Sequence, residues 1–405
     1  MDHFENTTVV VCKASGTYYP TQPPYHPDQR YAEYLFHSYG SEHNTLYEAV
    51  RACLRAAGLD REHYSTPAWN PLKNLIEPGE TVLLKPNLIK EYHPRDRDGW
   101  QYVVTHGSVI RAVADYVWKA LEGRGKIIVA DAPHTDSSFD AIVRILALDM
   151  IRNFYRAEGL DFEFVDLRQE EWTTRDGVVV SRRGRPGDPN GYIAFDLGKY
   201  SEFADHPGTG RYVGADYNTR EVNRHHSGGR HEYLVAASAI QCDVMFSLPK
   251  LKTHKKAGIT VSLKNLVGVS GDKNWLPHHT EGDPSNGGDE HPSPNFKHRF
   301  ERSLVPMFYR LSLRAPVIGS RLHHLARRLG VHLFGNTEKV IRSGNWWGND
   351  TVWRMCLDLN KIIFYGNQDG TLRPGTPEGR KRHFVLVDGI IAGEGRGPML
   401  SLIHI

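Results

Sequence analysis

The sequence predicts an α/β fold: a mostly parallel sheet with helices on both faces, interrupted by a large loop-rich insertion. Two observations lead to this class. Short apolar runs that suit buried strands alternate with longer segments whose apolar residues recur at helical spacing. Between about 172 and 230 this alternation stops, and Gly, Arg, Asp and Asn replace the apolar runs. We therefore expect one sheet assembled from segments on both sides of this insertion.

The expected elements follow a regular order along the chain. The predicted strands are short apolar runs at 8–12, 81–84, 126–130, 162–165, 243–248 and 384–387. The predicted helices carry apolar residues three and four positions apart, at 45–57, 106–121 and 139–158. Thr105 is the candidate N-cap of the second helix. Within and after the insertion we expect a hairpin near 177–181, a lid-like loop near 223–230 and a helix over 231–241.

We expect a single domain over residues 1–399, truncated at its C-terminus. After the insertion a helical segment is predicted at about 297–360, basic over 302–333 and ending in a buried helix. The final hexapeptide, LSLIHI at 400–405, is what a common transposon-end sequencing adapter encodes in one reading frame. We therefore expect this tail to be non-native and to pack poorly against the rest of the chain.

Composition and charge argue against several classes of protein. The 405 residues are 40% hydrophobic and 24% charged, and the net charge of +3 gives no electrostatic basis for nucleic-acid binding. The N-terminus lacks a secretory pattern and no run approaches about 18 apolar residues, so we expect a cytoplasmic protein with no membrane partner. None of the four cysteines stands in a CxxC pair, so the sequence encodes no cysteine-ligated iron–sulfur cluster.

The segment 247–279 gathers many potential ligands between apolar runs. It follows a predicted strand and places charged and polar side chains first in a loop and then on a short helix: Lys250, Lys252, Thr253, His254, Lys264 and Asn265. Because open α/β sheets bind ligands beyond the carboxyl ends of their strands, we interpret this group as part of a site. The alternative is a basic loop exposed to solvent, which is where most lysines lie.

Other polar residues also come directly after predicted strands. Lys85 and Asn87 follow one strand, Asp131 follows the next, and Asp388 and Glu394 come after the last. Because these strand ends share an edge in a parallel sheet, we expect the side chains to converge on one crevice. Lysine ammonium groups suit a small anion such as a phosphate or carboxylate, while a carboxylate or an imidazole can move a proton.

This reasoning assigns two roles. The predicted substrate-binding residues are Lys85, Asn87, Lys250, Lys252, Thr253, Lys264 and Asn265. The predicted catalytic residues are His254, Asp131 and Glu394. A divalent metal held by the carboxylates stays open as a cofactor.

Several of these residues have a structural alternative. Asp131 and Asp388 also suit helix caps or strand-end turns, and Asn87 and Asn265 suit hydrogen bonds to loop backbone. Adjacent side chains seldom bind one metal ion together, which makes the consecutive histidines His278 and His279 weak ligand candidates. The glycine-rich segment at 393–397 could cradle a phosphate, but it lacks the full dinucleotide-binding fingerprint.

The motifs together resemble the DUF362 family, a group named for its unknown function. The matching elements are Lys85-Pro86-Asn87, Thr105, Asp131, the run PKLKTH at 249–254, SLKN at 262–265, and Asp388-Gly389 followed by GEGRGP at 393–398. They occur in consistent order over nearly the whole chain. Some members of the family carry a ferredoxin-like cluster domain, and the cysteine pattern here departs from theirs. The family has no general assigned reaction, so the resemblance adds little about function.

From the residues we expect an enzyme that acts on a small anionic substrate by proton transfer or isomerisation next to a carboxylate or phosphate. Lysines would bind the anion, while His254 or a carboxylate moves the proton. Two alternatives stay open. The first is a metal- or redox-linked accessory protein whose cluster or partner is supplied elsewhere, and the second is a non-catalytic anion-binding protein.

Overall fold

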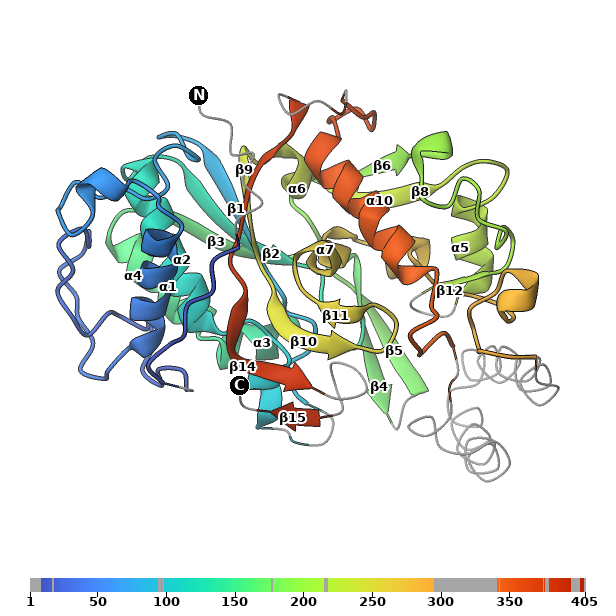
Figure 1. Ribbon diagram of the computed structural model, residues 1–405, viewed down its shortest axis with the longest axis horizontal. Helices are drawn as coiled ribbons and strands as arrows, with labels where there is room; N and C mark the ends of the chain where they lie inside the picture. Colours follow the sequence, from blue (N-terminus) through green and yellow to red (C-terminus); the bar gives the residue numbers. More distant parts are fainter. Residues whose placement is uncertain are drawn as a thin grey trace.

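The centre of the molecule is a five-stranded parallel sheet. The computed structural model describes residues 9–16, 18–93, 96, 98–175, 178–214, 218–294, 341, 343–373, 375, 379–394 and 401–403. In spatial order the strands are β13 (Arg382–Val385), β9 (Val244–Leu248), β1 (Thr81–Pro86), β2 (Lys126–Asp131) and β3 (Asp161–Asp166). All neighbours in this sheet pair in parallel, so the predicted sheet is confirmed (Figure 1).

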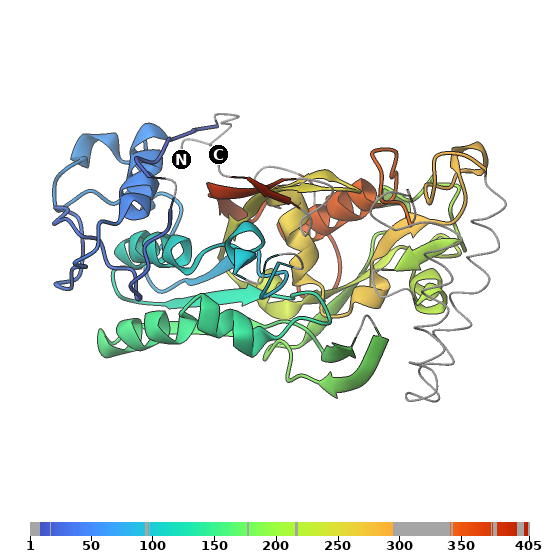
Figure 2. The same ribbon diagram turned by 90° about the horizontal axis from the view of Figure 1, so that it is seen from below.

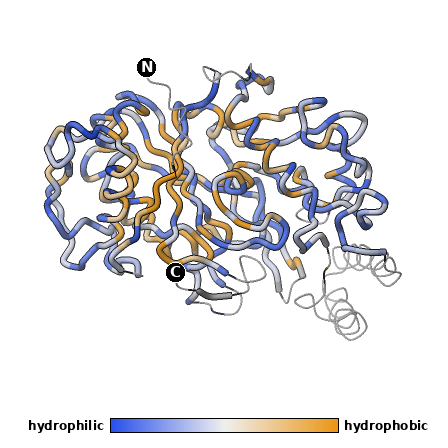
Figure 3. Tube along the Cα trace, in the orientation of Figure 1, coloured by the Kyte–Doolittle hydropathy of each residue, from blue (hydrophilic) through white to orange (hydrophobic). Residues whose placement is uncertain are grey.

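The strands form where they do because both of their faces are covered. Parallel strands buried on two sides need nearly continuous apolar runs, and β1, β2 and β9 are buried along almost their whole length. Successive residues of a strand point to opposite faces of the sheet, so Val82 and Leu84 belong to one hydrophobic cluster and Leu83 belongs to the other. Figure 3 shows the resulting apolar band through the middle of the molecule.

Helices pack on both faces of the sheet. The first hydrophobic cluster joins the sheet to α1 (Thr45–Ala56), α2 (Gly107–Leu121), α3 (Phe139–Ile145) and α4 (Leu148–Ala157). The second cluster joins the opposite face to α6 (Ala237–Gln241), α10 (Val352–Tyr365) and the strands of the insertion. In Figure 1 α1, α2 and α4 lie on the left and α10 lies on the right. Among the described residues no helix combines the length and apolar character needed to cross a membrane.

The order of the strands contains a reversal that positions the site. The chain runs from β1 outward to β2 and β3, and then returns to the other side of β1 for β9 and β13. Its winding direction therefore changes between β1 and β9. In open α/β sheets ligands bind outside the carboxyl ends of the two strands at such a switch point.

Two strands of the main sheet continue beyond its carboxyl edge into a second sheet. After short breaks, β9 leads into β10 (Lys250–His254) and β13 leads into β14 (Asp388–Glu394). These pair in parallel, and β11 (Gly258–Thr260) and β15 (Ser401–Ile403) complete the sheet. The prediction of a loop at 250–254 is therefore wrong. The polar sequence KLKTH does not resemble a buried strand, and its pairing with two partners decides its conformation.

The insertion is more ordered than predicted. The expected hairpin is confirmed as β4 (Glu170–Arg175) with β5 (Val178–Gly184), which project from the body in Figure 2. The lid-like loop predicted near 223–230 is shorter than expected, because α5 (Thr219–His225) covers its start; residues 226–230 form the loop, and His226 in it is buried. The helix predicted over 231–241 is wrong in its first half. That half forms β8 (Glu232–Ala236), which pairs with β6 (Tyr192–Asp196), while β7 (Tyr212–Gly214) pairs with β12 (Pro277–Thr280).

Smaller differences concern helix ends and the first strand. The helix predicted at 139–158 is divided into α3 and α4 at Ala147, whose φ of 54° lies in the left-handed region. His106, rather than Thr105, caps α2, because its side chain accepts the N–H of Ser108. Residues 9–12 form no strand. The buried helix expected near 360 is confirmed as α10.

Some predictions concern residues that are not described. The basic segment 302–333 and the glycine-rich residues 395–398 lie outside the described residues. The side chains of 401–403 do as well, so poor packing of the last six residues stays a prediction. Short 3-10 helices occupy several connections, at η1 (Arg61–His63), η2 (Gly99–Tyr102), η3 (Gly198–Tyr200), η4 (Leu266–Val269), η5 (Lys273–Trp275) and η6 (Pro284–Asn286).

Candidate functional site

The carboxyl end of β1 holds a buried ion pair. Lys85 Nζ lies 2.6 Å from Asp131 Oδ1, and both side chains are almost fully enclosed. Burial lowers the pKa of Lys85, and the charge of Asp131 opposes this shift. The other carboxylate oxygen, Asp131 Oδ2, accepts the N–H of Leu88 at 2.6 Å. The pair therefore connects the ends of β1 and β2 and places a charged couple beside the switch point.

Asn265, on α7 (Ser262–Asn265), connects β1 to β9. Its Nδ2 donates to the carbonyl of Lys85 at 2.7 Å and to Ser247 Oγ at 3.0 Å. Thr105 makes a similar connection, because its hydroxyl accepts the N–H of Asn87 and donates to the carbonyl of Leu248 at 2.6 Å. These contacts hold the strand ends at a fixed separation.

Lys250 takes part in a second, completely buried ion pair. Its Nζ lies 3.2 Å from Asp388 Oδ2 and donates to the hydroxyl of Tyr19 at 2.5 Å. Tyr19 in turn donates to Asp388 Oδ1, and its ring stacks on His106 with 4.1 Å between centroids. Burial lowers the pKa of Lys250 and Asp388 opposes the shift. The ammonium group of Lys250 is thus occupied by protein groups.

Lys252 lies two residues further along β10, on the same face of the strand as Lys250, and has a different environment. It is 2% exposed, and its Nζ donates to the carbonyl of Val103 at 2.5 Å and to Asn87 Oδ1 at 3.1 Å. No described carboxylate lies within ion-pair distance of this amine. The pKa of Lys252 lies well below its usual value because of burial first, and then because of the charges of Lys264 and Lys250.

Lys264 faces the same region from α7. It is half-buried, its pKa is lowered by burial, and within the described part of the chain it has no hydrogen-bond or ion-pair partner. Its charge also acts on His254, whose pKa lies well below the usual value because of burial, Lys264 and Lys256. Burial lowers the pKa of Lys256 itself to about 8. Positive groups are therefore concentrated between β10 and α7.

His254 ends β10 with a defined hydrogen-bond pattern. Its Nδ1 accepts the backbone N–H groups of Lys256 and Ala257, each at 3.2 Å. This assigns the ring proton to Nε2, because an acceptor nitrogen carries no hydrogen. With its lowered pKa, the imidazole is neutral near pH 7 and offers one N–H donor.

The remaining predicted residues are less closely associated with the lysines. Thr253 lies on β10 opposite Ile259. Glu394 is exposed at the end of β14, and no hydrogen bond or ion pair between described residues joins it to the lysines. His278 donates its Nδ1 proton to the carbonyl of Leu276. Across the described ranges there is no cluster of three or more His, Cys, Asp or Glu side chains that could hold a metal ion, and the four cysteines are free thiols.

A cavity lies beyond the ends of β2 and β3. Its volume is about 340 Å³, and its lining comes from the ends of β2 and β3, the β4–β5 hairpin and the segment before η5: Thr135, Arg168, Gln169, Glu170, Arg182, Gly184, Gly271, Asp272 and Lys273. Sequence reasoning missed Arg168, although it follows β3 at the same edge and the strand-end rule could have found it. Its guanidinium is bound by Asp166 and by the carbonyls of 134, 135 and 137.

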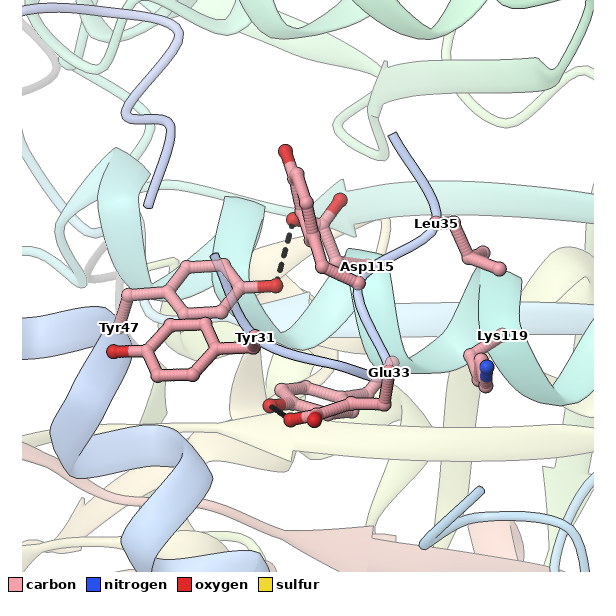
Figure 4. Close-up of a pocket in the computed structure, with 8 residues that line it drawn as sticks. Tyr31, Glu33, Leu35, Tyr47, Asp115 and Lys119 are labelled. Atoms are coloured by element: carbon pink, nitrogen blue, oxygen red, sulfur yellow. Dashed lines mark hydrogen bonds between the residues drawn. The ribbon is translucent and has the colours of Figure 1, made fainter. Parts of the chain in front are cut away.

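A second cavity, between α1, α2 and the segment 31–35, holds only about 10 Å³. Figure 4 shows its lining, in which Tyr47 points its hydroxyl at Asp115. The hydroxyl donates to Asp115 Oδ2 at 3.1 Å, and burial raises the pKa of this carboxyl group. A volume of this size accommodates about one water molecule, so this cavity is part of the packing of the core.

The chain was compared with known proteins. The profile of one family, described as a domain of unknown function (DUF362), matches residues 82–186 and 187–402. No curated protein matches. A solved structure of a Thermotoga maritima protein matches at 11% identity over 56% of this chain and 39% of that one, with a TM-score of 0.28. The family match spans both ion pairs and strand β10, and the chain therefore belongs to the DUF362 family.

Proposed function

We propose that the protein binds a small anion, a phosphate or a carboxylate, at the carboxyl edge between β1 and β9, and moves a proton on that ligand. The observation that carries the proposal is the pair formed by Lys252 and Lys264. Both face the same region, Lys252 is buried and Lys264 half-buried, and neither has a carboxylate partner among the residues described.

The charges of the four predicted lysines divide into two classes. Lys85 and Lys250 each have a carboxylate of their own, in Asp131 and Asp388. Lys264 has no carboxylate of its own among the described residues, and its charge lowers the pKa of both Lys252 and Lys256, so protonating these amines together raises the free energy of the folded state. An anion bound between them would remove this cost. The partial exposure of Lys264 leaves the region open to a ligand.

The other residues fit supporting roles in this proposal. Asn265 holds the strand ends, Asn87 accepts a hydrogen bond from Lys252, and Asp131 holds Lys85. The neutral imidazole of His254 can donate one hydrogen bond to the anion from Nε2. Glu394 has no role here, because it is exposed and no hydrogen bond or ion pair between described residues joins it to the lysines. Proton transfer or isomerisation next to the anionic group is the reaction expected of such a site, and a cytoplasmic location stays a prediction.

Titration calorimetry with inorganic phosphate and with malonate tests the proposal. Replacing Lys264 by Met keeps the aliphatic stem and removes the charge, so the dissociation constant should rise by about 10- to 150-fold, the equivalent of roughly 1.5–3 kcal/mol for a charge-assisted hydrogen bond. The matched control is Lys199→Met, on exposed η3, which should leave the affinity unchanged. Equal affinity in the parent and Lys264→Met proteins, or no binding of either anion, would refute the proposal. Turnover of a bound ligand separates an enzyme from a non-catalytic binding protein.

A further inference from the structure

We infer that Lys252 is held as an uncharged amine, and that this amine, rather than His254, accepts the proton from the substrate. The inference rests on the proposed anion site and gives Lys252 a catalytic role in place of the anion-binding role expected from the sequence.

The hydrogen bonds of Lys252 match an amine better than an ammonium group. An uncharged amine has two N–H groups and one lone pair, whereas an ammonium has three N–H groups and no lone pair. Nζ contacts two acceptors, the carbonyl of Val103 and Asn87 Oδ1. No third acceptor from the described ranges lies within hydrogen-bond distance. Both N–H groups of an amine are thus satisfied, and its lone pair is not engaged.

The charges around Lys252 also disfavour a third proton. Lys250 on the same strand, Lys264 on α7 and Lys85 on β1 contribute positive charge, and Asp131 on β2 contributes negative charge. That carboxylate is already in contact with Lys85. Burial and these charges together place the pKa of Lys252 well below its usual value.

Lys250 provides an internal comparison. It lies on the same strand, faces the same side and is equally buried, but it has a carboxylate at 3.2 Å. Two equally buried lysines of one strand therefore differ in whether a carboxylate contacts the amine, and such a contact favours the charged form.

An uncharged amine beside an anion site suits an anionic carbon acid. The substrate class we infer is a carboxylate or phosphate that carries a carbonyl group and a C–H bond next to it. The lone pair of Lys252 takes that proton, so an N–H bond forms, the C–H bond breaks, and its electron pair moves onto the carbonyl oxygen as an enolate. Return of the proton to a different atom completes an isomerisation without any other reactant. Lys264 and the new ammonium group offset the charge of the enolate.

Labelling with cyanate tests the protonation state without any ligand. Isocyanic acid adds to an uncharged amine to give a urea, and mass spectrometry of a digest measures the modification of each lysine. Exposed Lys199 in the same sample is the reference. Because both lysines meet the same concentration of isocyanic acid, dividing the modification of Lys252 by that of Lys199 removes the pH dependence of the reagent. The uncharged fraction of an exposed lysine rises about tenfold per pH unit below its pKa of roughly 10.4. If Lys252 is already uncharged, the ratio of Lys252 to Lys199 modification should fall about tenfold per unit from pH 7 to 9.

If the ratio of Lys252 to Lys199 modification stays constant from pH 7 to 9, Lys252 is an ammonium group and the inference is overturned. The variant Asn87→Asp provides the matched control, because it places a carboxylate where Oδ1 now lies 3.1 Å from Nζ, and it should make the ratio constant. If burial keeps cyanate away, the Cε resonance of Lys252, assigned by its loss in Lys252→Arg, decides the question. A Cε chemical shift typical of an unprotonated amine at pH 7 supports the inference, and a chemical shift typical of an ammonium group overturns it.

The two proposals fail separately. Phosphate binding together with a constant ratio would keep the anion site and remove the uncharged amine. A falling ratio without binding of phosphate or malonate would keep the amine and remove the anion site.

Discussion

Lys250 and Lys252 are neighbours on one face of β10, and their difference shows how a single partner changes what a lysine can do. Asp388 and the hydroxyl of Tyr19 occupy the ammonium group of Lys250. Among the described residues, Lys252 contacts a carbonyl and an amide oxygen and no carboxylate. The contacts of Lys250 stabilise a positive charge inside the protein, whereas a positive charge on Lys252 would raise the free energy of the folded state.

Replacing Lys250 by Met should destabilise the protein by about 3–5 kcal/mol, because Asp388 would keep its negative charge in a buried region without a counter-ion. Urea denaturation measures the change in the free energy of unfolding. The exposed control Lys199→Met should change it by less than about 0.5 kcal/mol. Adding Asp388→Asn to the Lys250 variant should restore part of the loss. A loss below about 1 kcal/mol in the single variant would contradict a structural role for this ion pair.

At the scale of elements, the site depends on how closely η4 approaches the end of β2. The N–H of Ala132 donates to the carbonyl of Gly268 at 2.7 Å. A Cβ atom at Gly268 would lie 1.9 Å from Asp131 Oδ1 and 2.6 Å from Lys85 Nζ. Only glycine allows the helix and the ion pair to occupy these positions together.

Replacing Gly268 by Ala should therefore lower the free energy of unfolding by about 3 kcal/mol, because the added methyl group displaces either η4 or the ion pair. Urea denaturation again measures the change. In the control Gly389→Ala, the nearest side-chain atom to the new Cβ is Leu251 Cδ2 at 3.5 Å, an ordinary contact. The two variants should differ clearly, and equal stability would mean that η4 moves away at little cost.

At the scale of the whole molecule, the sheet separates two hydrophobic clusters of different character. The cluster on the side of α10 includes Phe203, Tyr212 and Tyr233, which surround His226. Burial lowers the pKa of His226 to about 3, and its ring nitrogen is bonded to the carbonyl of Trp275. This part of the molecule therefore contains an ionisable group that must stay neutral in the folded state.

Stability should decrease in acid because of His226. The unfolded chain binds a proton at this residue below a pH of about 6.5, while the folded protein does so only near pH 3, so unfolding takes up a proton between these values. The stabilising contribution is complete above about pH 6.5 and is lost as the pH falls, by up to roughly 1.4 kcal/mol per pH unit.

Denaturation of the parent and His226→Gln proteins from pH 7 to pH 4 measures this contribution. The variant should be less stable at pH 7, where it loses packing, but its stability should fall less steeply with decreasing pH. Parallel curves would show that His226 is not the group responsible. The comparison separates this residue from buried histidines elsewhere in the fold, such as His106, that are present in both proteins.

The sequence alone determined the class of fold and the edge at which polar residues gather. Buried parallel strands require continuous apolar runs, which are local and visible, so the five strands of the central sheet were predicted within a few residues. The positions directly after those strands placed Lys85, Asn87 and Asp131 at one edge for the same reason.

The tertiary structure decided the conformation and chemistry of strand β10 and the partners of its lysines. Its polar sequence forms a strand because β11 and β14 supply its backbone hydrogen bonds, and β14 lies far away in the chain. Lys250 pairs with a carboxylate 138 residues away, whereas Lys252 has none within the described residues. Which charges meet across such distances depends on the packing of the whole chain, and no local pattern in the sequence records it.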